Sequence, residues 1–269
     1  MMRRWLDALA RRRGPRSRPP ERPVLVGGSP KSGTTAIAML LGVATETGVA
    51  SDPFHRLDQR GVDFRDRLFS GRLSIAHLID DNPDVFAAGI IKDPNFAFFI
   101  GPLLERFPHS HFVFIVRDPR ANIRSILNRL GIRGDARQET VDAKLRDLPE
   151  GWRRVLTGRT PDVAGTDFIE RMAYRWNAAV DAYRSYVDRV RLVIYEEFDR
   201  DKEAVISSLA ADVGLEVSRP LGAAADRQFQ PRGERDVDWV EFFGERNLAT
   251  IDRICEDRMR PLGYEPRAT

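Results

Sequence analysis

The segment Pro23–Ala36 constrains the fold more than any other part of the chain. It reads PVLVGGSPKSGTTA, an apolar run that ends in glycines, continues into a short loop and then enters a stretch of helical character, TTAIAMLLGVA. This order predicts a strand, a tight turn and a helix. Backbone N–H groups at the start of such a helix have no partner within it, and the helix dipole favours an anion there. The segment therefore predicts a phosphate-binding loop.

Glycine, lysine and hydroxyl side chains come together in this loop. Gly33 would let the backbone turn with a positive φ, and the threonines that follow it can donate hydroxyl hydrogen bonds. A lysine ammonium suits a point contact on a phosphate oxygen. The residues that we expect to hold the phosphate are Ser29, Lys31, Ser32, Gly33, Thr34 and Thr35.

The loop departs from the nucleoside triphosphate pattern GxxxxGK[ST]. Gly28 and Gly33 have the glycine spacing of that pattern, but the next residue is Thr34, and the lysine has moved to position 31. A kinase or ATPase needs the lysine after the second glycine to reach the β- and γ-phosphates, and usually a carboxylate that holds magnesium. Triphosphate hydrolysis is therefore disfavoured. A P-loop kinase of small molecules or nucleotides remains the alternative enzyme, and a noncatalytic nucleotide-binding protein is the other rival.

The rest of the chain alternates between short apolar runs and amphipathic segments. Because strands that alternate with helices are typical of layered α/β proteins, we expect an α/β fold with a mainly parallel sheet and a ligand beyond the carboxyl ends of its strands. The expected strands after the first are Gly89–Lys92, His111–Val116 and Val190–Tyr195, and the expected helices include Ala97–Phe107, Arg117–Leu130, Arg171–Val187, Asp201–Val213 and Asn247–Arg260.

Composition excludes several classes of protein. Cys255 is the only cysteine, so an intrachain disulfide is impossible, and a reducing, cytoplasmic location fits best. No apolar run reaches the roughly 18 residues of a membrane-spanning helix. The net charge of +3 owes much to arginines in residues 1–22, which we expect to form a basic, disordered tail; no comparable basic run downstream predicts a nucleic-acid partner.

Residues 131–167 are rich in Gly, Arg, Asp and Pro and have weak periodicity. We interpret them as an excursion from a single domain of residues 23–269, an insertion or lid on the acceptor side, because such segments often carry recognition. The sequence leaves the oligomeric state open.

Two motifs in this order resemble those of sulfotransferases that use 3′-phosphoadenosine 5′-phosphosulfate (PAPS). SPKSGTT resembles the 5′-phosphosulfate loop of that family. In Arg117-Asp-Pro-Arg-Ala-Asn-Ile-Arg-Ser125, the first arginine follows an expected strand and the serine lies eight positions on. In the family, an arginine and a serine with this spacing grip the 3′-phosphate, and Arg offers phosphate a bidentate fork.

Two further resemblances are weaker. Tyr195-Glu-Glu-Phe198 is similar to the family's Tyr-Glu-Asp-Leu element near the adenine, although a tyrosine at the end of a strand is as often a packing residue. Gln230-Pro-Arg-Gly-Glu234 resembles a loop that adds a 3′-phosphate contact, through Arg232 and Gly233 here. The resemblance implies a three-layer, P-loop NTPase-like sulfotransferase fold, closer to the bacterial and carbohydrate-modifying branch than to the cytosolic phenol-type branch.

The resemblance also implies a reaction, the transfer of a sulfuryl group from PAPS to a hydroxyl or amine, which leaves PAP. In the family a loop lysine, here Lys31, assists the departing phosphate, and a His or Glu deprotonates the acceptor. Asp52 is our first candidate for this base and His55 the second, although an Asp-Pro turn and a surface histidine explain them equally well. Lys92 and Asp93 could line the same cleft or cap a strand.

The acceptor is undetermined at this stage and could be a small molecule, a carbohydrate or a lipid. No His, Cys or carboxylate spacing in the sequence predicts a metal site, so we expect no catalytic metal and full activity in a chelator.

Overall fold

The computed structural model describes residues 18–159, 163–227, 229 and 238–267 of the chain. The first 17 residues of the basic tail lie outside the described part, as do Arg232 and Gly233. The described residues contain one sheet of five strands in the order β2-β3-β1-β4-β5, and every neighbouring pair is parallel. The strands are β1 (Val24–Gly28), β2 (Val49–Ser51), β3 (Ile90–Lys92), β4 (His111–Val116) and β5 (Val190–Ile194).

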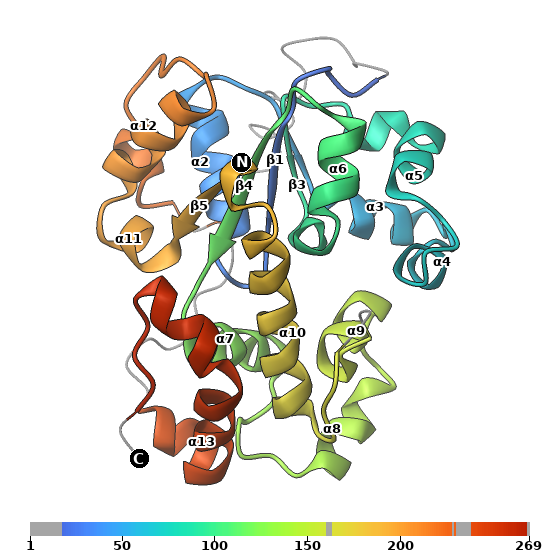
Figure 1. The fold of residues 1–269 in the computed structure, drawn as a ribbon, viewed down its shortest axis with the longest axis vertical. Helices are drawn as coiled ribbons and strands as arrows, with labels where there is room; N and C mark the ends of the chain where they lie inside the picture. Colours follow the sequence, from blue (N-terminus) through green and yellow to red (C-terminus); the bar gives the residue numbers. More distant parts are fainter. Residues whose placement is uncertain (1–17, 160–162, 228, 230–237, 268–269) are drawn as a thin grey trace.

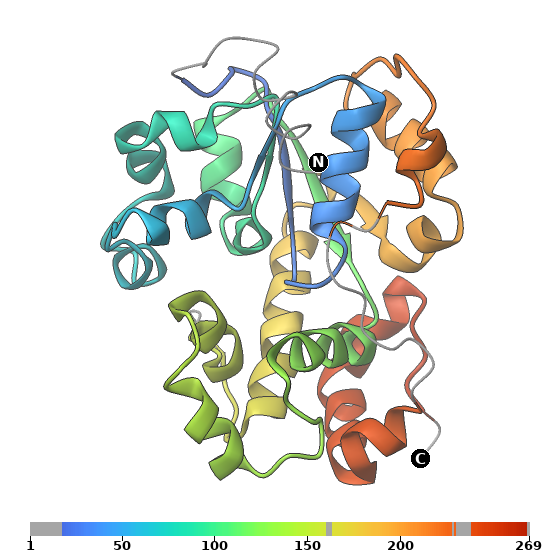
Figure 2. The same ribbon diagram turned by 180° about the vertical axis from the view of Figure 1, so that it is seen from behind.

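Helices cover both faces of this sheet, as Figures 1 and 2 show from opposite sides. The helices α2 and α12 pack on one face, and α6 and α10 pack on the other. The helix bounds are α2 (Thr34–Ala44), α3 (Pro53–Gln59), α4 (Arg65–Phe69), α5 (Ile75–Asp81), α6 (Ile100–Arg106), α7 (Pro119–Leu130), α8 (Gln138–Leu145), α9 (Glu150–Thr157), α10 (Phe168–Arg184), α11 (Tyr195–Arg200), α12 (Lys202–Asp212) and α13 (Trp239–Met259). The expected three-layer α/β fold is confirmed.

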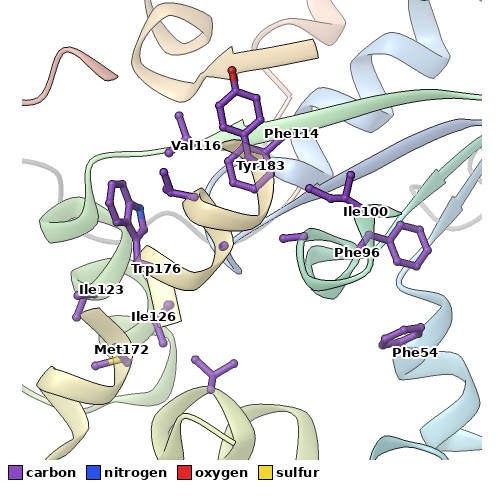
Figure 3. Packing of buried hydrophobic residues seen from close by; sticks show 14 of the residues in the cluster. Phe54, Phe96, Ile100, Phe114, Val116, Ile123, Ile126, Met172, Trp176 and Tyr183 are labelled. Carbon is purple, nitrogen blue, oxygen red and sulfur yellow. The ribbon is translucent and has the colours of Figure 1, made fainter. Parts of the chain in front are cut away.

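The sheet has a hydrophobic core on each face, and the side chains of its strands alternate between these two cores. In β4, Phe112 and Phe114 belong to the core under α10, whereas Val113 and Ile115 belong to the core under α2. This follows from the two-residue period of a strand, which sends successive side chains to opposite faces. Figure 3 shows the ring of Phe114 stacked on Tyr183 of α10, with centroids 5.1 Å apart.

Helix α10 packs against both the sheet and α7. Trp176 and Met172 lie beside Ile123 and Ile126 of α7 (Figure 3), and all four side chains are buried. The indole Nε1 of Trp176 donates to the carbonyl of Arg117, at 2.9 Å. The start of α7 is therefore fixed both by apolar packing and by a partly buried hydrogen bond.

Several elements differ from the sequence-based expectations. The predicted helix Ala97–Phe107 is divided into a 3₁₀ turn, Pro94–Phe98, and α6, while Tyr195 begins α11 instead of ending a strand. The excursion 131–167 contains two helices, α8 and α9, and α3 and α4 were not anticipated. These helices have only five to eight residues, too few for a stable isolated helix, so packing against the rest of the fold decides them.

The helix expected over Asn247–Arg260 begins eight residues earlier, at Trp239, and contains a kink at Gly244, whose φ is 70°. None of the helices in the described ranges is both long and apolar enough to cross a bilayer.

Candidate active site

A cavity of about 580 Å³ opens at the carboxyl ends of the strands, where the parallel sheet predicts a ligand. The cavity is lined by residues of the predicted phosphate loop (Gly28–Thr35), hereafter called the phosphate loop, and by the first turn of α3 and the ends of β3 and β4. The cavity-facing sides of α7, α9 and α11 complete it. The expected site residues that line it are Lys31, Gly33, Thr34, Thr35, Asp52, His55, Lys92, Asp93, Arg117, Ser125 and Tyr195.

Backbone conformation shapes the phosphate loop. Gly28 and Gly33 have φ values of 147° and 88°, and a Cβ atom at either position would collide with a neighbour, the carbonyl oxygen of Ile115 or the ring of Tyr195. Lys31 also has a positive φ, 66°, which is uncommon for a residue with a side chain. The loop is thus pressed against the ends of β4 and β5.

Asn122 of α7 fixes the phosphate loop through two hydrogen bonds. Its Nδ2 donates to the carbonyl of Pro30 at 2.7 Å and to Oγ of Ser32 at 3.0 Å. Ser29 and Ser32 are buried and do not line the cavity, so any contact of theirs with a phosphate stays a prediction. Sequence reasoning missed Asn122, although it lies within the RDPRANIRS motif and an amide in a phosphate motif was a usable signal.

Arg117 and Ser125 face the same cavity, as the second motif predicts. Arg117 Nη1 donates to the carbonyl of Lys31 at 3.1 Å, and its guanidinium carbon lies 4.5 Å from the centre of the Tyr195 ring. Its Nε is buried without a hydrogen-bond partner among the described residues. Because Arg117 is only partly buried and lines the cavity, its guanidinium reaches the cavity edge through nitrogens other than the buried Nε.

A second arginine, which sequence reasoning missed, joins this side of the cavity. Arg129 lies four residues after Ser125, on the same face of α7, and is exposed at the cavity wall. Burial lowers the pKa of the Lys31 ammonium, and the charges of Arg129 and Arg117 lower it further. Both arginines are thus close enough to Lys31 to repel its ammonium, and an anionic ligand would relieve this repulsion.

Asp52 follows β2 and begins α3 in a left-handed conformation, with φ 53° and ψ 55°. Its Oδ1 accepts a hydrogen bond from Lys92 Nζ at 2.7 Å, and its Oδ2 accepts one from Ser51 Oγ at 2.9 Å. Lys92 is buried and also donates to Thr35 Oγ1 at 2.9 Å. The lysine therefore links the candidate base to the first turn of α2.

His55 lies one turn further along α3 and is exposed at the cavity. Its Nε2 is 3.0 Å from Nε2 of Gln59. The structure thus brings both candidate bases to the cavity that holds Lys31, and it fixes Asp52 with more contacts than His55.

Asp93 fixes the backbone of the segment that carries the two candidate bases, Asp52 and His55. Its buried carboxylate accepts hydrogen bonds from the backbone N–H of Phe54 at 3.0 Å and from the backbone and side-chain nitrogens of Asn95, at 2.9 and 2.8 Å. Burial raises the pKa of Asp93, and the charge of Asp52 raises it further. Asp93 thus lines the cavity, as one alternative held, and it caps the 3₁₀ turn Pro94–Phe98 instead of a strand.

Helix α9 forms the opposite wall, with Pro149, Gly151, Trp152 and Val155. Arg154 ties this helix to Asp66 of α4. Beside it, Arg65 makes a bidentate pair with Asp58, with Nη2–Oδ2 at 2.7 Å and Nε–Oδ1 at 3.0 Å. Part of the excursion 131–167 is therefore a wall of the cavity.

Comparisons with known proteins address the family. The profile of the sulfotransferase family matches residues 68–219, more than half of the chain. The sulfotransferase STF9 from Mycobacterium avium has a similar structure, with a TM-score of 0.58 and 14% identity over 98% of this chain and 83% of that one. Mouse sulfotransferase SULT7A1, solved in complex with PAP, has a TM-score of 0.53 and 14% identity over 96% and 90%.

None of the curated protein sequences compared with the chain matches it significantly. At 14% identity the two structures establish the fold alone. The family profile goes further, because it spans the Arg117–Ser125 motif, the Tyr195 turn and the α9 wall. On this match the chain belongs to the sulfotransferase family.

Proposed function

We propose that the chain transfers a sulfuryl group from PAPS to a hydroxyl or amine of an acceptor, giving PAP and a sulfated product. The observation that carries this proposal is the gathering of Lys31, Arg117 and Arg129 at one end of a cavity that begins at the N-terminus of α2. A ligand with a single phosphate has little use for three cations on two separate elements. A nucleotide phosphorylated at both its 5′ and 3′ ends would engage both elements.

The residues present fit such a donor. The N-terminus of α2 with Lys31 would hold the 5′-phosphosulfate, and Arg117 with Ser125, which both line the cavity, would hold the 3′-phosphate. The adenine would lie beside Tyr195, near the apolar side chains of Phe198 and Phe229, which also line the cavity.

The chemistry that PAPS supplies is an activated sulfuryl group on a good leaving phosphate. The carboxylate of Asp52, or His55 as the second candidate, would take the proton of the acceptor as the acceptor oxygen or nitrogen bonds to sulfur. The bond between sulfur and the 5′-phosphate oxygen breaks, and its electron pair leaves with that phosphate. The Lys31 ammonium would stabilise the charge that develops on this oxygen.

Lys92 is placed to organise this step. Its ammonium holds Asp52 through Oδ1 and Thr35 through Oγ1, so the base and the first turn of α2 keep a fixed separation. A base held in one position meets the acceptor without a further loss of side-chain entropy, which favours catalysis.

Two rivals remain, a P-loop kinase and a noncatalytic nucleotide-binding protein. Thr34 still occupies the position where a triphosphate loop places its lysine, which argues against the kinase. The noncatalytic rival predicts PAP binding without any transfer. The single-domain organisation of residues 23–269 and the cytoplasmic location also stay predictions.

Calorimetry with PAP, PAPS and ATP separates the main alternatives. We expect PAP to bind and ATP not to bind, and the reverse result would refute the proposal. Incubation with PAPS and a panel of alcohols and amines, followed by mass spectrometry, then tests transfer itself. We expect the same product yield in EDTA as without it.

A further inference from the structure

The turns that follow β4 and β5 lie side by side at the edge of the cavity. The two strands are paired in parallel, with Val116 opposite Ile194. The next residues, Arg117 and Tyr195, therefore leave the sheet next to each other. Both line the cavity, and their side chains stack with the guanidinium carbon 4.5 Å from the ring centre.

Few contacts determine where the Arg117 guanidinium points. One Nη donates to the carbonyl of Lys31, the flat face stacks on Tyr195, and Nε has no partner among the described residues. The backbone of Arg117 is held more firmly, since Trp176 Nε1 binds its carbonyl. The aim of the guanidinium therefore depends on how precisely the two turns are held together.

One side chain bridges the two turns. Glu196, next to Tyr195, accepts a hydrogen bond through Oε1 from the backbone N–H of Asp118, next to Arg117, at 3.2 Å. Its Oε2 accepts a hydrogen bond from the hydroxyl of Tyr264 at 2.7 Å. Both carboxylate oxygens are thus engaged, and the carboxylate lies near the N-terminus of α7, where a negative charge is favourable.

Tyr264 belongs to the segment after α13, far away in the sequence but adjacent in space to α7 and α11 (Figures 1 and 2). The tyrosine is 8% exposed, and its backbone N–H binds the carbonyl of Met259 at 3.1 Å. Three residues on, the N–H of Arg267 donates to Asp252 at 3.3 Å. Burial and the charge of Glu196 raise the pKa of Tyr264, so it remains a hydroxyl donor at neutral pH.

We propose that Glu196, held in place by Tyr264, is a positioning residue that keeps Arg117 aimed at the 3′-phosphate of the donor. This role rests on the proposed function, because it assumes that Arg117 binds that phosphate. The C-terminal segment then sets donor affinity through Tyr264 without touching the donor.

The test compares two ligands, PAP and adenosine 5′-monophosphate, which lacks the 3′-phosphate. Their binding is measured by calorimetry for the wild-type chain and for Glu196→Ala, Glu196→Gln and Tyr264→Phe. Glu197→Ala is the matched control, because Glu197 is the exposed neighbour of Glu196 on the same helix. Thermal unfolding of each variant checks that it folds.

We expect Glu196→Ala to weaken PAP binding about tenfold, a loss comparable to that of a hydrogen bond to a charged group, and to change the binding of adenosine 5′-monophosphate less than about twofold. Glu196→Gln should restore most of the affinity, since its amide can accept from Asp118 and donate to the Tyr264 oxygen. Tyr264→Phe keeps the packing and should cost about threefold. Glu197→Ala should bind both ligands as the wild-type chain does.

Equal losses for both ligands in Glu196→Ala would overturn the positioning role, because they would show a general loosening of the site. Unchanged PAP affinity in Glu196→Ala and Tyr264→Phe would overturn it as well. Failure of the wild-type chain to bind PAP would instead refute the proposed function on which the role rests.

Discussion

The two ends of the cavity differ in their balance of positive and negative charge. At the proposed donor end, Lys31, Arg117 and Arg129 gather; burial lowers the pKa of Lys31, and the charges of Arg129 and Arg117 lower it further. At the other end each cation is paired with a carboxylate, Lys92 with Asp52 and Arg65 with Asp58. Surplus positive charge suits a polyanionic nucleotide, whereas balanced pairs suit an acceptor whose reacting group carries no negative charge.

The two ends also differ in how they are made. The donor end consists of strand ends and helix starts, which the parallel sheet places with little freedom. The acceptor end relies on α9, a helix of eight residues tied to α4 through Arg154 and Asp66. Changes at the donor end should therefore affect nucleotide binding and transfer together, whereas changes at the acceptor end should leave nucleotide binding unchanged.

The largest effect is expected at Lys31. Lys31→Ala removes the cation beside the departing phosphate, and loss of one such stabilising group typically slows turnover by about 10² to 10³. The variant should fold, which its thermal unfolding would verify. A Lys31→Ala enzyme with a wild-type turnover rate would remove this lysine from the mechanism.

The candidate bases come next. Asp52→Asn keeps an oxygen for Lys92 but cannot take a proton, so kcat should fall by about tenfold or more if Asp52 is the base. His55→Asn tests the second candidate in the same assay, with His77→Asn, an exposed histidine away from the cavity, as its control. If both Asp52→Asn and His55→Asn retain full turnover, neither residue is the base.

A smaller and more selective effect is expected on the α9 wall. Trp152→Ala should raise the KM for the acceptor about fivefold, as truncation of a contacting aromatic commonly does, and leave PAP affinity unchanged. Arg153→Ala is the control, since Arg153 is the exposed next residue and does not line the cavity. A loss of PAP affinity in Trp152→Ala would contradict the division of the cavity into two ends.

The smallest effect concerns Arg129 and pH. PAP affinity should decline as the pH rises through the lowered pKa of Lys31, because the neutral amine loses its attraction to phosphate. Arg129→Gln removes one cause of that lowered pKa. The decline should therefore begin at a higher pH, while affinity at neutral pH falls by up to about fivefold, the value of an exposed ion pair.

Calorimetric titrations from about pH 7 to about pH 10 would record both changes. The control is Arg133→Gln, because Arg133 is exposed, lies off the cavity and pairs with Asp135 at 2.8 Å. An unshifted decline in Arg129→Gln would separate Arg129 from the donor site.

Much of the donor end was predictable from sequence because short motifs encode it. The strand His111–Val116 and the helix Thr34–Ala44 have the predicted bounds, and the loop between β1 and α2 carries its own glycines. Arg117, which precedes α7, and Ser125, which lies within it, could be paired because their spacing matches the motif of the family that the chain resembles. Arg129 was not predicted as a site residue because one more arginine in an arginine-rich chain does not by itself indicate a binding role.

The acceptor end was much less predictable. Residues 131–167 show weak periodicity because α8 and α9 are short, and α9 depends on its packing against α10 and its ion pair with α4. The pairing of Lys92 with both Asp52 and Thr35 joins three segments that are far apart in the sequence, and no local pattern encodes such a contact.

By itself, the sequence determined the strand, turn and helix of residues 24–44, the alternation of strands with helices and the spacing of Arg117 and Ser125, because each depends on neighbours within a few residues. Only the tertiary structure decided that Asn122 anchors the loop, that Lys92 holds Asp52 and that Tyr264 reaches Glu196. Those contacts arise when packing closes long loops of chain, and local propensities carry no information about which distant side chains will then meet.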